Sequence, residues 1–331
     1  NVLSSEKTQI RNILGTATSV FARIPSKIIG SGIDWVRSAA TGAERTMFLS
    51  EVPPAFVATF KGMRQGMSDM AYAWKNGFTR HRFNVSYKKA LQGRFDKTYY
   101  ELGGGLANPL NYPARALMAA DAFFRSMAYN QELVGSSWSR ALREVGKKDP
   151  GKFNKRLQEL IADPKVKEAA EEASVEAVFQ TELGSMGRRL QSLVQGIPGG
   201  FLILPFVRIA GNLLKQGIQM SPAGALTPVG RGVTGTARQI AHARGAAGVG
   251  TLAMFPLALL ALEGKVSGRG PRDRTERARL FEAGWRPHSV NVGGTWYDYR
   301  LLQPIGVPMA IVANAFEAYR ESGQGDEESA T

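Results

Sequence analysis

A seven-residue apolar repeat between Pro113 and Val145 is the feature that most restricts how this 331-residue chain can fold. Residues three and four apart fall on one face of an α-helix, so the repeat predicts one long helix with an apolar stripe. Pro113 suits its first turn, and Lys147 and Lys148 suit its C-terminal end, where the helix dipole favours cations. Other helices must cover such a stripe. Its two rows are Leu117, Phe124, Gln131, Trp138 and Val145, and Ala120, Met127, Val134 and Ala141.

Prolines divide the flanking segments into shorter expected helices. Proline removes a backbone donor and clashes with the preceding turn, so we expect helix breaks at Pro25 and at Pro53-Pro54. We also expect a helical pair over residues 151–183, divided near Asp163-Pro164. Its acidic residues are interpreted as a solvated helix face. They are Glu168, Glu171, Glu172, Glu176 and Glu182.

The C-terminal part contains the one firm strand signal. The segments Ser289–Val292 and Thr295–Arg300 flank Gly293-Gly294, and a two-residue glycine turn between β-prone arms predicts a tight hairpin. A Gly/Arg-rich linker and a charged helix over Asp273–Ala283 are expected before it. The polar, acidic residues 322–331 are expected to be a disordered tail.

These patterns predict a mainly α fold, an irregular multi-helix assembly with one small β-hairpin near the C-terminus. We expect a basic helical region over residues 1–105 and a helical core with apolar segments over residues 106–263. Residues 264–331 would hold the linker, the charged helix, the hairpin, a final helix and the acidic tail.

The charge balance favours an anionic partner, because 42 Lys and Arg against 28 Asp and Glu give a net charge of +14. Half of this excess lies in segment 61–97, where aromatic residues that can stack on unpaired bases are interspersed. The segment predicts sequence-independent DNA binding that weakens with salt, although a lipid or protein surface and a merely solvated face are alternatives. The candidate phosphate contacts are Lys75, Arg80, Arg82, Lys88, Lys89 and Arg94.

Three charge-free stretches, Leu190–Val207, Gly245–Leu262 and Leu301–Phe316, approach the length of a membrane span. Prolines interrupt all three, so buried core helices are the first interpretation, and contact with other subunits or with lipid is the second. Ala246 and Gly250 have the small-xxx-small spacing that lets helices approach closely. The complete set of candidate oligomer or membrane contacts is Phe201, Leu204, Phe206, Ala246, Gly250, Leu257 and Leu260.

No motif predicts catalysis, a metal site or a cofactor. Cysteine is absent, which excludes disulfides, thiolate ligands and a cysteine nucleophile. The histidines, His81, His242 and His288, lack metal-ligand spacing, and no phosphate-binding loop occurs. We therefore expect no catalytic residue, no metal, no cofactor and no enzyme activity.

Two stretches resemble a known module: Leu204–Lys215 with Ser221-Pro222, and Glu282–Val292 continuing through Trp296–Pro304. Together with segment 113–145, they are similar to a helical module of large bacteriophage polyvalent proteins and internal virion proteins. The resemblance extends from about Asn108 to Phe316 and carries over no catalytic residue.

The resemblance implies a location inside the phage capsid, followed by ejection into the host periplasm or inner membrane. It further implies a homo-oligomeric conduit for genome delivery, with other ejection or portal proteins, phage DNA and the host inner membrane as partners. The alternative is a soluble, non-specific nucleic-acid-binding module of a mobile-element polyprotein, in which the apolar stretches form the core.

Overall fold

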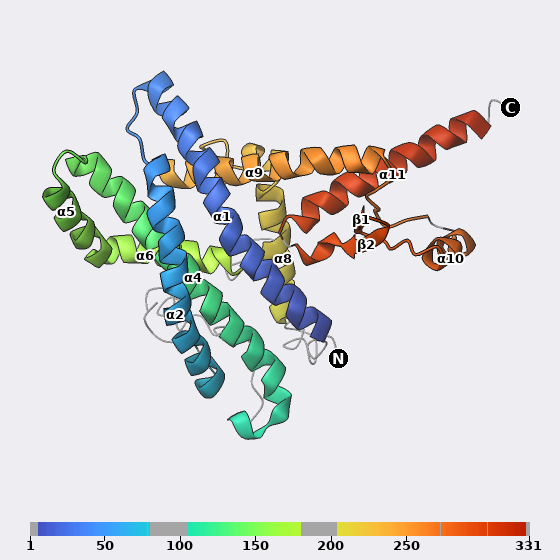
Figure 1. Ribbon diagram of the computed structural model, residues 1–331, viewed down its shortest axis with the longest axis horizontal. Coiled ribbons are helices and arrows are strands. Elements are labelled where there is room, and N and C mark those ends of the chain that lie inside the picture. The colour runs from blue at the N-terminus through green and yellow to red at the C-terminus, as the bar shows by residue number, and fades with distance from the viewer. Residues whose placement is uncertain are drawn as a thin grey trace.

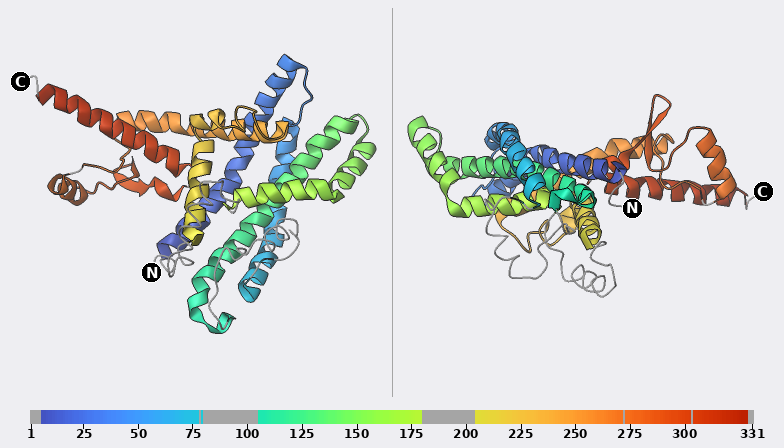
Figure 2. Two further views of the ribbon diagram at one scale, coloured as in Figure 1. Left: turned by 180° about the vertical axis from the view of Figure 1, so that it is seen from behind. Right: turned by 90° about the horizontal axis from the view of Figure 1, so that it is seen from below.

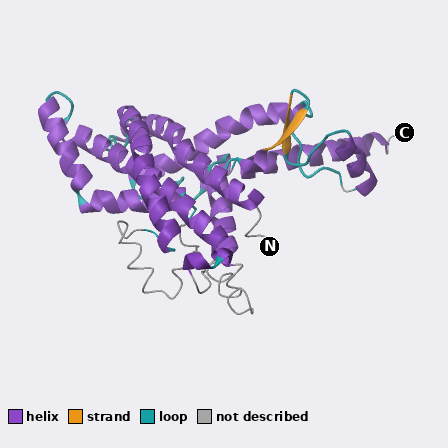
Figure 3. Ribbon diagram, turned by 60° about the horizontal axis from the view of Figure 1, so that its bottom comes forward, coloured by secondary structure: helices purple, strands orange, loops and turns teal. Residues whose placement is uncertain are grey.

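The computed structural model describes residues 6–77, 79, 105–179, 204–271, 273–302 and 304–328. It confirms a mainly α-helical fold with one antiparallel hairpin near the C-terminus (Figures 1 and 3). The helices are α1 (Glu6–Thr41), α2 (Val52–Asn76), α4 (Tyr112–Val145), α5 (Pro150–Ala162), α6 (Pro164–Ala177), α8 (Leu204–Gln219), α9 (Ala237–Leu262), α10 (Arg274–Glu282) and α11 (Gly306–Glu328). The strands are β1 (Ser289–Val292) and β2 (Thr295–Asp298), and short 3-10 turns include η1 (Leu49–Glu51), η6 (Pro222–Leu226) and η7 (Tyr299–Leu301).

Helix α4 is the long helix that the seven-residue repeat predicts, and α2 runs antiparallel along it. The contact is close because α2 turns glycine and alanine toward α4. A Cβ atom on Gly62 would lie 2.8 Å from the Ser126 carbonyl oxygen, and one on Gly66 would lie 2.7 Å from that of Phe123. The regions expected over residues 1–105 and 106–263 therefore pack directly against each other along α2 and α4.

Helices α5 and α6 cover another side of α4. Asp149 and Asp163 cap their N-termini by accepting hydrogen bonds from the backbone amides of Lys152 and Lys165. The predicted division near Asp163-Pro164 is therefore correct, since the capping carboxylate and the following proline together start a new helix. The packed residues between these helices include Leu133, Ala141, Phe153, Leu157 and Leu160.

Helix α1 crosses α9 and continues through Pro25, so the predicted break there is wrong. Glycines bring the two helices together: a Cβ on Gly30 would lie 2.7 Å from the Ala241 carbonyl oxygen, and Gly245 packs against the backbone of Ser26. Ser26 and Gly30 pack against α9 after Pro25, and Val20 is buried with Phe124 and Met127 of α4 before it. These contacts outweigh the one hydrogen bond that proline removes. Pro53-Pro54, by contrast, lies in the first turn of α2, as expected.

The C-terminal part forms an arm beside the helical body, in which the C-terminal half of α9 and α11 run near the hairpin (Figure 1). Ser289 pairs with Asp298 and Val292 with Thr295, which confirms the predicted hairpin. Helix α11 continues to Glu328, so the expected disordered tail from Ser322 is wrong over the described residues. A small core holds the arm together: Ala261, Val266, Tyr299, Met309 and Ala313.

Replacing Gly66 with alanine tests the α2–α4 contact. The new methyl group would press on the Phe123 backbone, so we expect a loss of about 1–3 kcal/mol in the free energy of unfolding. Gly32→Ala is the matched control, because nothing lies within 4 Å of its Cβ position. It should stabilise the protein by up to ~1 kcal/mol through helix propensity. Chemical denaturation measures the free energy of unfolding of both variants. Equal changes in Gly66→Ala and Gly32→Ala would contradict the close packing of α2 on α4.

Candidate functional site

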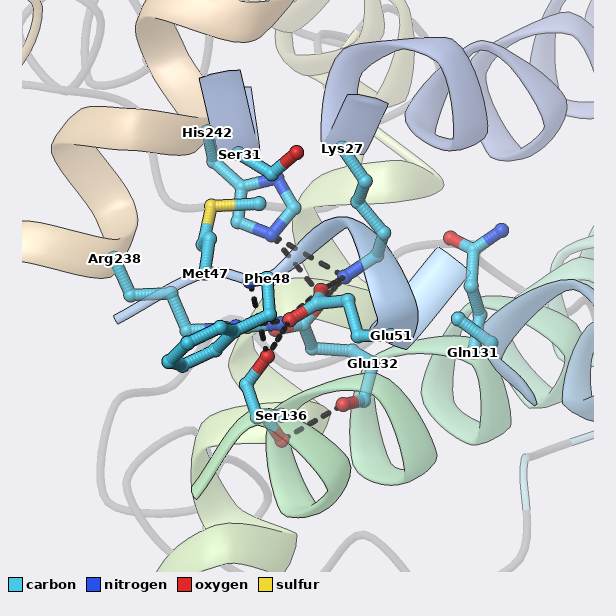
Figure 4. Close-up of polar contacts among 12 residues, drawn as sticks. Lys27, Ser31, Met47, Phe48, Glu51, Gln131, Glu132, Ser136, Arg238 and His242 are labelled. Carbon is cyan, nitrogen blue, oxygen red and sulfur yellow. Dashed lines mark hydrogen bonds and ion pairs between the residues drawn. The ribbon is translucent and has the colours of Figure 1, made fainter. Parts of the chain in front are cut away.

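A buried network of charged side chains joins four elements of the helical body (Figure 4). The Lys27 ammonium group of α1 lies 3.0 Å from Glu51 Oε1 of η1 and 2.6 Å from Glu132 Oε2 of α4. Arg238 of α9 donates to both oxygens of Glu51, at 2.8 and 2.9 Å, and to Glu132 Oε1 at 2.8 Å. His242, one turn later on α9, has Nε2 3.4 Å from both Lys27 Nζ and Glu132 Oε2.

The surrounding residues leave room for this network and complete it. A Cβ on Gly135 would lie 3.3 Å from both Lys27 Nζ and Glu51 Oε1, so the glycine makes space one turn after Glu132. The Ser139 hydroxyl donates to Glu51 Oε2. Arg238 also donates to the Thr46 carbonyl oxygen, at 3.2 Å, which attaches α9 to the segment that leads into η1.

The mutual contacts shift the pKa values of the two carboxyl groups and of the imidazole. Burial on its own would raise the pKa of Glu51. The positive charges of Arg238 and Lys27 outweigh this effect and lower the pKa to about 2. The pKa of Glu132 is likewise held well below its usual range by Arg238 and Lys27 against the effect of burial. Burial, together with the positive charge of Lys27, lowers the pKa of His242 to about 4. At neutral pH two cations therefore balance two carboxylates beside a neutral imidazole.

This arrangement fixes helices, because its charged groups contact one another across α1, η1, α4 and α9. The Lys27 amine is fully buried and contacts two carboxylates and an imidazole, so it has no free position at which a substrate could bind. Within the described ranges, no group of three or more His, Cys, Asp or Glu side chains is arranged to hold a metal ion. A buried, balanced network of this kind sets which helix faces meet.

A second buried ion pair shows that one of the acidic residues expected on a solvated face is instead buried. Glu171 of α6 is buried, and its Oε1 accepts a hydrogen bond of 2.7 Å from Arg125 of α4. Burial raises the pKa of Glu171 to about 7 despite this partner. Its neighbours Glu168 and Glu172 on α6 are exposed, as expected of a solvated face.

Most of the candidate DNA contacts lie outside the described part of the chain. Only Lys75 belongs to it: this residue is exposed in the last turn of α2, and its carbonyl oxygen accepts a hydrogen bond from Arg115. The residues outside the described ranges are Arg80, Arg82, Lys88, Lys89 and Arg94.

The candidate oligomer or membrane contacts divide into three groups. Phe201 lies outside the described residues, while Leu204 and Phe206 begin α8 with side chains that are not described. Ala246 is partly buried, and Gly250 packs against the Met220 backbone, so the predicted close approach of Gly250 is made within the chain. Leu257 and Leu260 are half-buried against the core of the C-terminal arm.

The outward face of α9 instead carries Leu252, Phe255, Leu259 and Leu262. These residues follow each other at steps of three and four, and Leu252 and Phe255 are 68% and 69% exposed. Among the described helices, α9 is the one long and apolar enough to cross a bilayer, and 22% of its most apolar window is buried. The sequence could have indicated this row, because the charge-free stretch Gly245–Leu262 contains all four residues.

Comparison with known proteins adds no assignment for this arrangement. No family model, curated protein or solved structure matches the chain.

Replacing Lys27 with methionine tests the network. The two carboxylates would then face Arg238 alone, and we expect a loss of about 3–5 kcal/mol in the free energy of unfolding. Adding Glu132→Gln restores the charge balance and should recover part of that loss. The matched control is Lys152→Met, which removes an exposed lysine 3.7 Å from Asp149 and should change stability by less than ~0.5 kcal/mol. Equal losses in the two lysine variants would contradict the account.

Stability should also fall in acid, through His242 and then Glu51. The His242 pKa is about 4 against an ordinary 6.5, so the unfolded chain takes up this proton first and stability is lost between those pH values, by on the order of 3 kcal/mol. The Glu51 contribution is lost between about pH 4.5 and 2. Glu171 has a raised pKa and opposes this trend, so the useful quantity is the difference between the natural chain and His242→Gln. Parallel stability curves between pH 6.5 and 4 would refute the role of His242.

Proposed function

We propose that this chain is a structural protein of a bacteriophage virion, which self-associates into part of a conduit for genome delivery across the host envelope. The observation that carries the proposal is the outward apolar row of α9, formed by Leu252, Phe255, Leu259 and Leu262. Contiguous exposed apolar surface on a folded protein is typical of sites where it associates with a partner. The resemblance to phage internal virion proteins supplies the setting.

The row on α9 suits a second copy of the chain. No charged residue occurs from Gly245 to Leu262, so two copies can approach without repulsion between like charges. Steps of three and four between its large residues match the spacing that packs one helix against another. Row-to-row contact gives a two-fold dimer, whereas contact of this row with a different surface of the next copy gives a ring when its rotation closes.

A membrane span by α9 is a less suitable use of the same residues. The first half of α9 is attached to the body through Arg238 and His242, and moving it into a bilayer would leave Glu51 and Glu132 buried with fewer partners. Removing one member of a buried charge network is costly, at about 3–5 kcal/mol. Contact between copies keeps the network intact.

The proposal also names partners and locations. The chain would reside inside the capsid and then in the host periplasm or inner membrane, with other ejection or portal proteins and phage DNA beside it. It has 42 Lys and Arg residues against 28 Asp and Glu residues, and this excess of positive charge would screen the phosphates of passing DNA. Segment 61–97 remains the predicted DNA contact.

Charges placed on the α9 row test the proposal. The double variant Leu252→Glu, Leu259→Glu should remain folded and lose self-association, with the dissociation constant raised by roughly 100-fold or more, because each carboxylate would be buried in the contact. Analytical ultracentrifugation and electron microscopy measure the assembly. Leu257 and Leu260 are unsuitable positions, since they support the core of the C-terminal arm.

The matched control is the double variant Leu226→Glu, Val233→Glu, because both residues are 70% exposed on the segment between α8 and α9. It adds the same charge away from the row and should assemble like the natural chain. A natural chain that stays monomeric at high concentration, with and without lipid, would refute the conduit and favour the soluble nucleic-acid-binding module.

A further inference from the structure

Helix α1 has an inverted distribution of polarity: its inward face is polar and its outward face is apolar. The inward side chains include Thr16, Ser19, Lys27 and Asp34, all buried. They are used inside the molecule, where Ser19 donates to Gln216 at 3.1 Å and Asp34 accepts from the backbone amides of Thr46 and Met47. The large outward residues are Ile10, Ile13, Leu14, Phe21, Ile28, Trp35 and Val36.

Helix α2 repeats this inversion with small residues in place of polar ones. Its buried residues are mainly alanine and glycine, together with Thr59 and Asp69. Asp69 is bonded to the Ser126 hydroxyl at 2.6 Å, so its charge is not available at the surface. The large outward residues are Phe56, Val57, Phe60, Met63, Met67 and Trp74.

The outward sides of these two helices adjoin and form one surface, which we call the α1–α2 face. The rings of Phe21 and Phe60 have centroids 6.3 Å apart. Figures 1 and 2 show α1 and α2 on the same side of α4. With 36 residues, α1 alone is ~54 Å long, so the apolar surface is extended rather than a single pocket. Soluble monomers rarely expose such a continuous apolar surface, which indicates a partner.

The charges on this face identify the kind of partner. Among the described side chains of α1 and α2, the acids are Asp34 and Asp69, and both are buried. The exposed charges are Lys61, Arg64 and Lys75, and helical spacing places them along one edge of the apolar row of α2. The face is therefore apolar with a basic edge.

We infer that the α1–α2 face binds the surface of an anionic lipid bilayer, with both helices lying in the plane of the headgroups. Helices with apolar and aromatic residues on one side and Lys or Arg beside them bind membranes in this manner. A second copy docked through the same face would oppose Lys61, Arg64 and Lys75 to their equivalents, which like-charge repulsion disfavours. Nucleic acid matches the basic edge and leaves the isoleucines, phenylalanines and methionines uncovered.

This inference rests on the proposed function in one respect, which is the membrane that the chain would meet in the host. It concerns a different surface from the self-association row, since α9 contributes Leu252, Phe255, Leu259 and Leu262, whereas the α1–α2 face comes from residues 10–74. Lipid binding and self-association can therefore be measured separately.

Vesicle flotation of the whole chain tests the inference. The natural chain should float with vesicles of phosphatidylglycerol and phosphatidylethanolamine and should bind pure phosphatidylcholine weakly. The variant Phe60→Gln, Met67→Gln should lower the partition coefficient about tenfold or more, because two apolar side chains leave the bilayer. The variant Lys61→Gln, Arg64→Gln should lower it roughly 10- to 30-fold for the anionic vesicles alone.

Two matched variants control for net charge and for exposed apolar area. Lys165→Gln, Lys167→Gln removes the same charge from exposed positions on α6, and Leu226→Gln, Val233→Gln removes exposed apolar residues elsewhere. Both should float like the natural chain, and circular dichroism checks that every variant is folded.

Three results would overturn the inference: no flotation of the natural chain, equal loss in the control variants, or face variants that abolish self-association without lipid while leaving flotation unchanged. The last result would identify a protein interface. Self-association without flotation would be consistent with the proposed function and would contradict the lipid-binding inference. Flotation of a strictly monomeric chain would support the inference and remove the proposed conduit.

Discussion

The position of the Lys27 ammonium group between Glu51 and Glu132 is the interaction on which the arrangement of the helices depends. With Arg238, these side chains bring α1, η1, α4 and α9 to one point. A charge in this position must be matched, because an unpaired buried charge costs several kcal/mol. The helices can therefore rotate or slide only if the whole network is broken. Apolar packing alone would allow more rotations and shifts of the helices, because the hydrophobic effect is not directional.

The inverted polarity of α1 follows from the same constraint. Turning Lys27 inward fixes the rotation of the helix, and residues on the opposite side, such as Phe21, Ile28 and Trp35, must then face outward. In α2 the close contact with α4 requires glycine and alanine inside, which sends Phe60 and Met67 to the surface. The large apolar side chains of the core come mainly from α4 and α5, such as Leu133, Phe153 and Leu160. Helices α1 and α2 pack on the body mainly through ion pairs and small residues, so their own large apolar side chains remain at the surface.

Local signals in the sequence predicted the elements, and long-range contacts decided the site. The repeat of α4, the Asp163-Pro164 division and the Gly293-Gly294 turn each depend on a few neighbouring residues, so they were predictable. The network was not, because Lys27 and His242 are 215 positions apart and no alignment of charges along the chain indicates their contact. The continuation of α1 through Pro25 was missed for the same reason, since packing on α9 supports it. Lone charges within otherwise apolar helical stretches, such as Lys27 and Glu132, were the available signal.

The absence of cysteine allows a direct measurement of the central claim, that α1 and α2 turn their large apolar residues outward. Single cysteines can replace Ile28 and Met67 on the outward side, and Ser31 and Ala58 on the inward side, with each variant carrying one thiol. The account predicts that a polar thiol reagent labels the chain quickly at positions 28 and 67 and slowly at positions 31 and 58. Faster labelling at positions 31 and 58 than at 28 and 67 would show the opposite rotation of the helices and contradict the account.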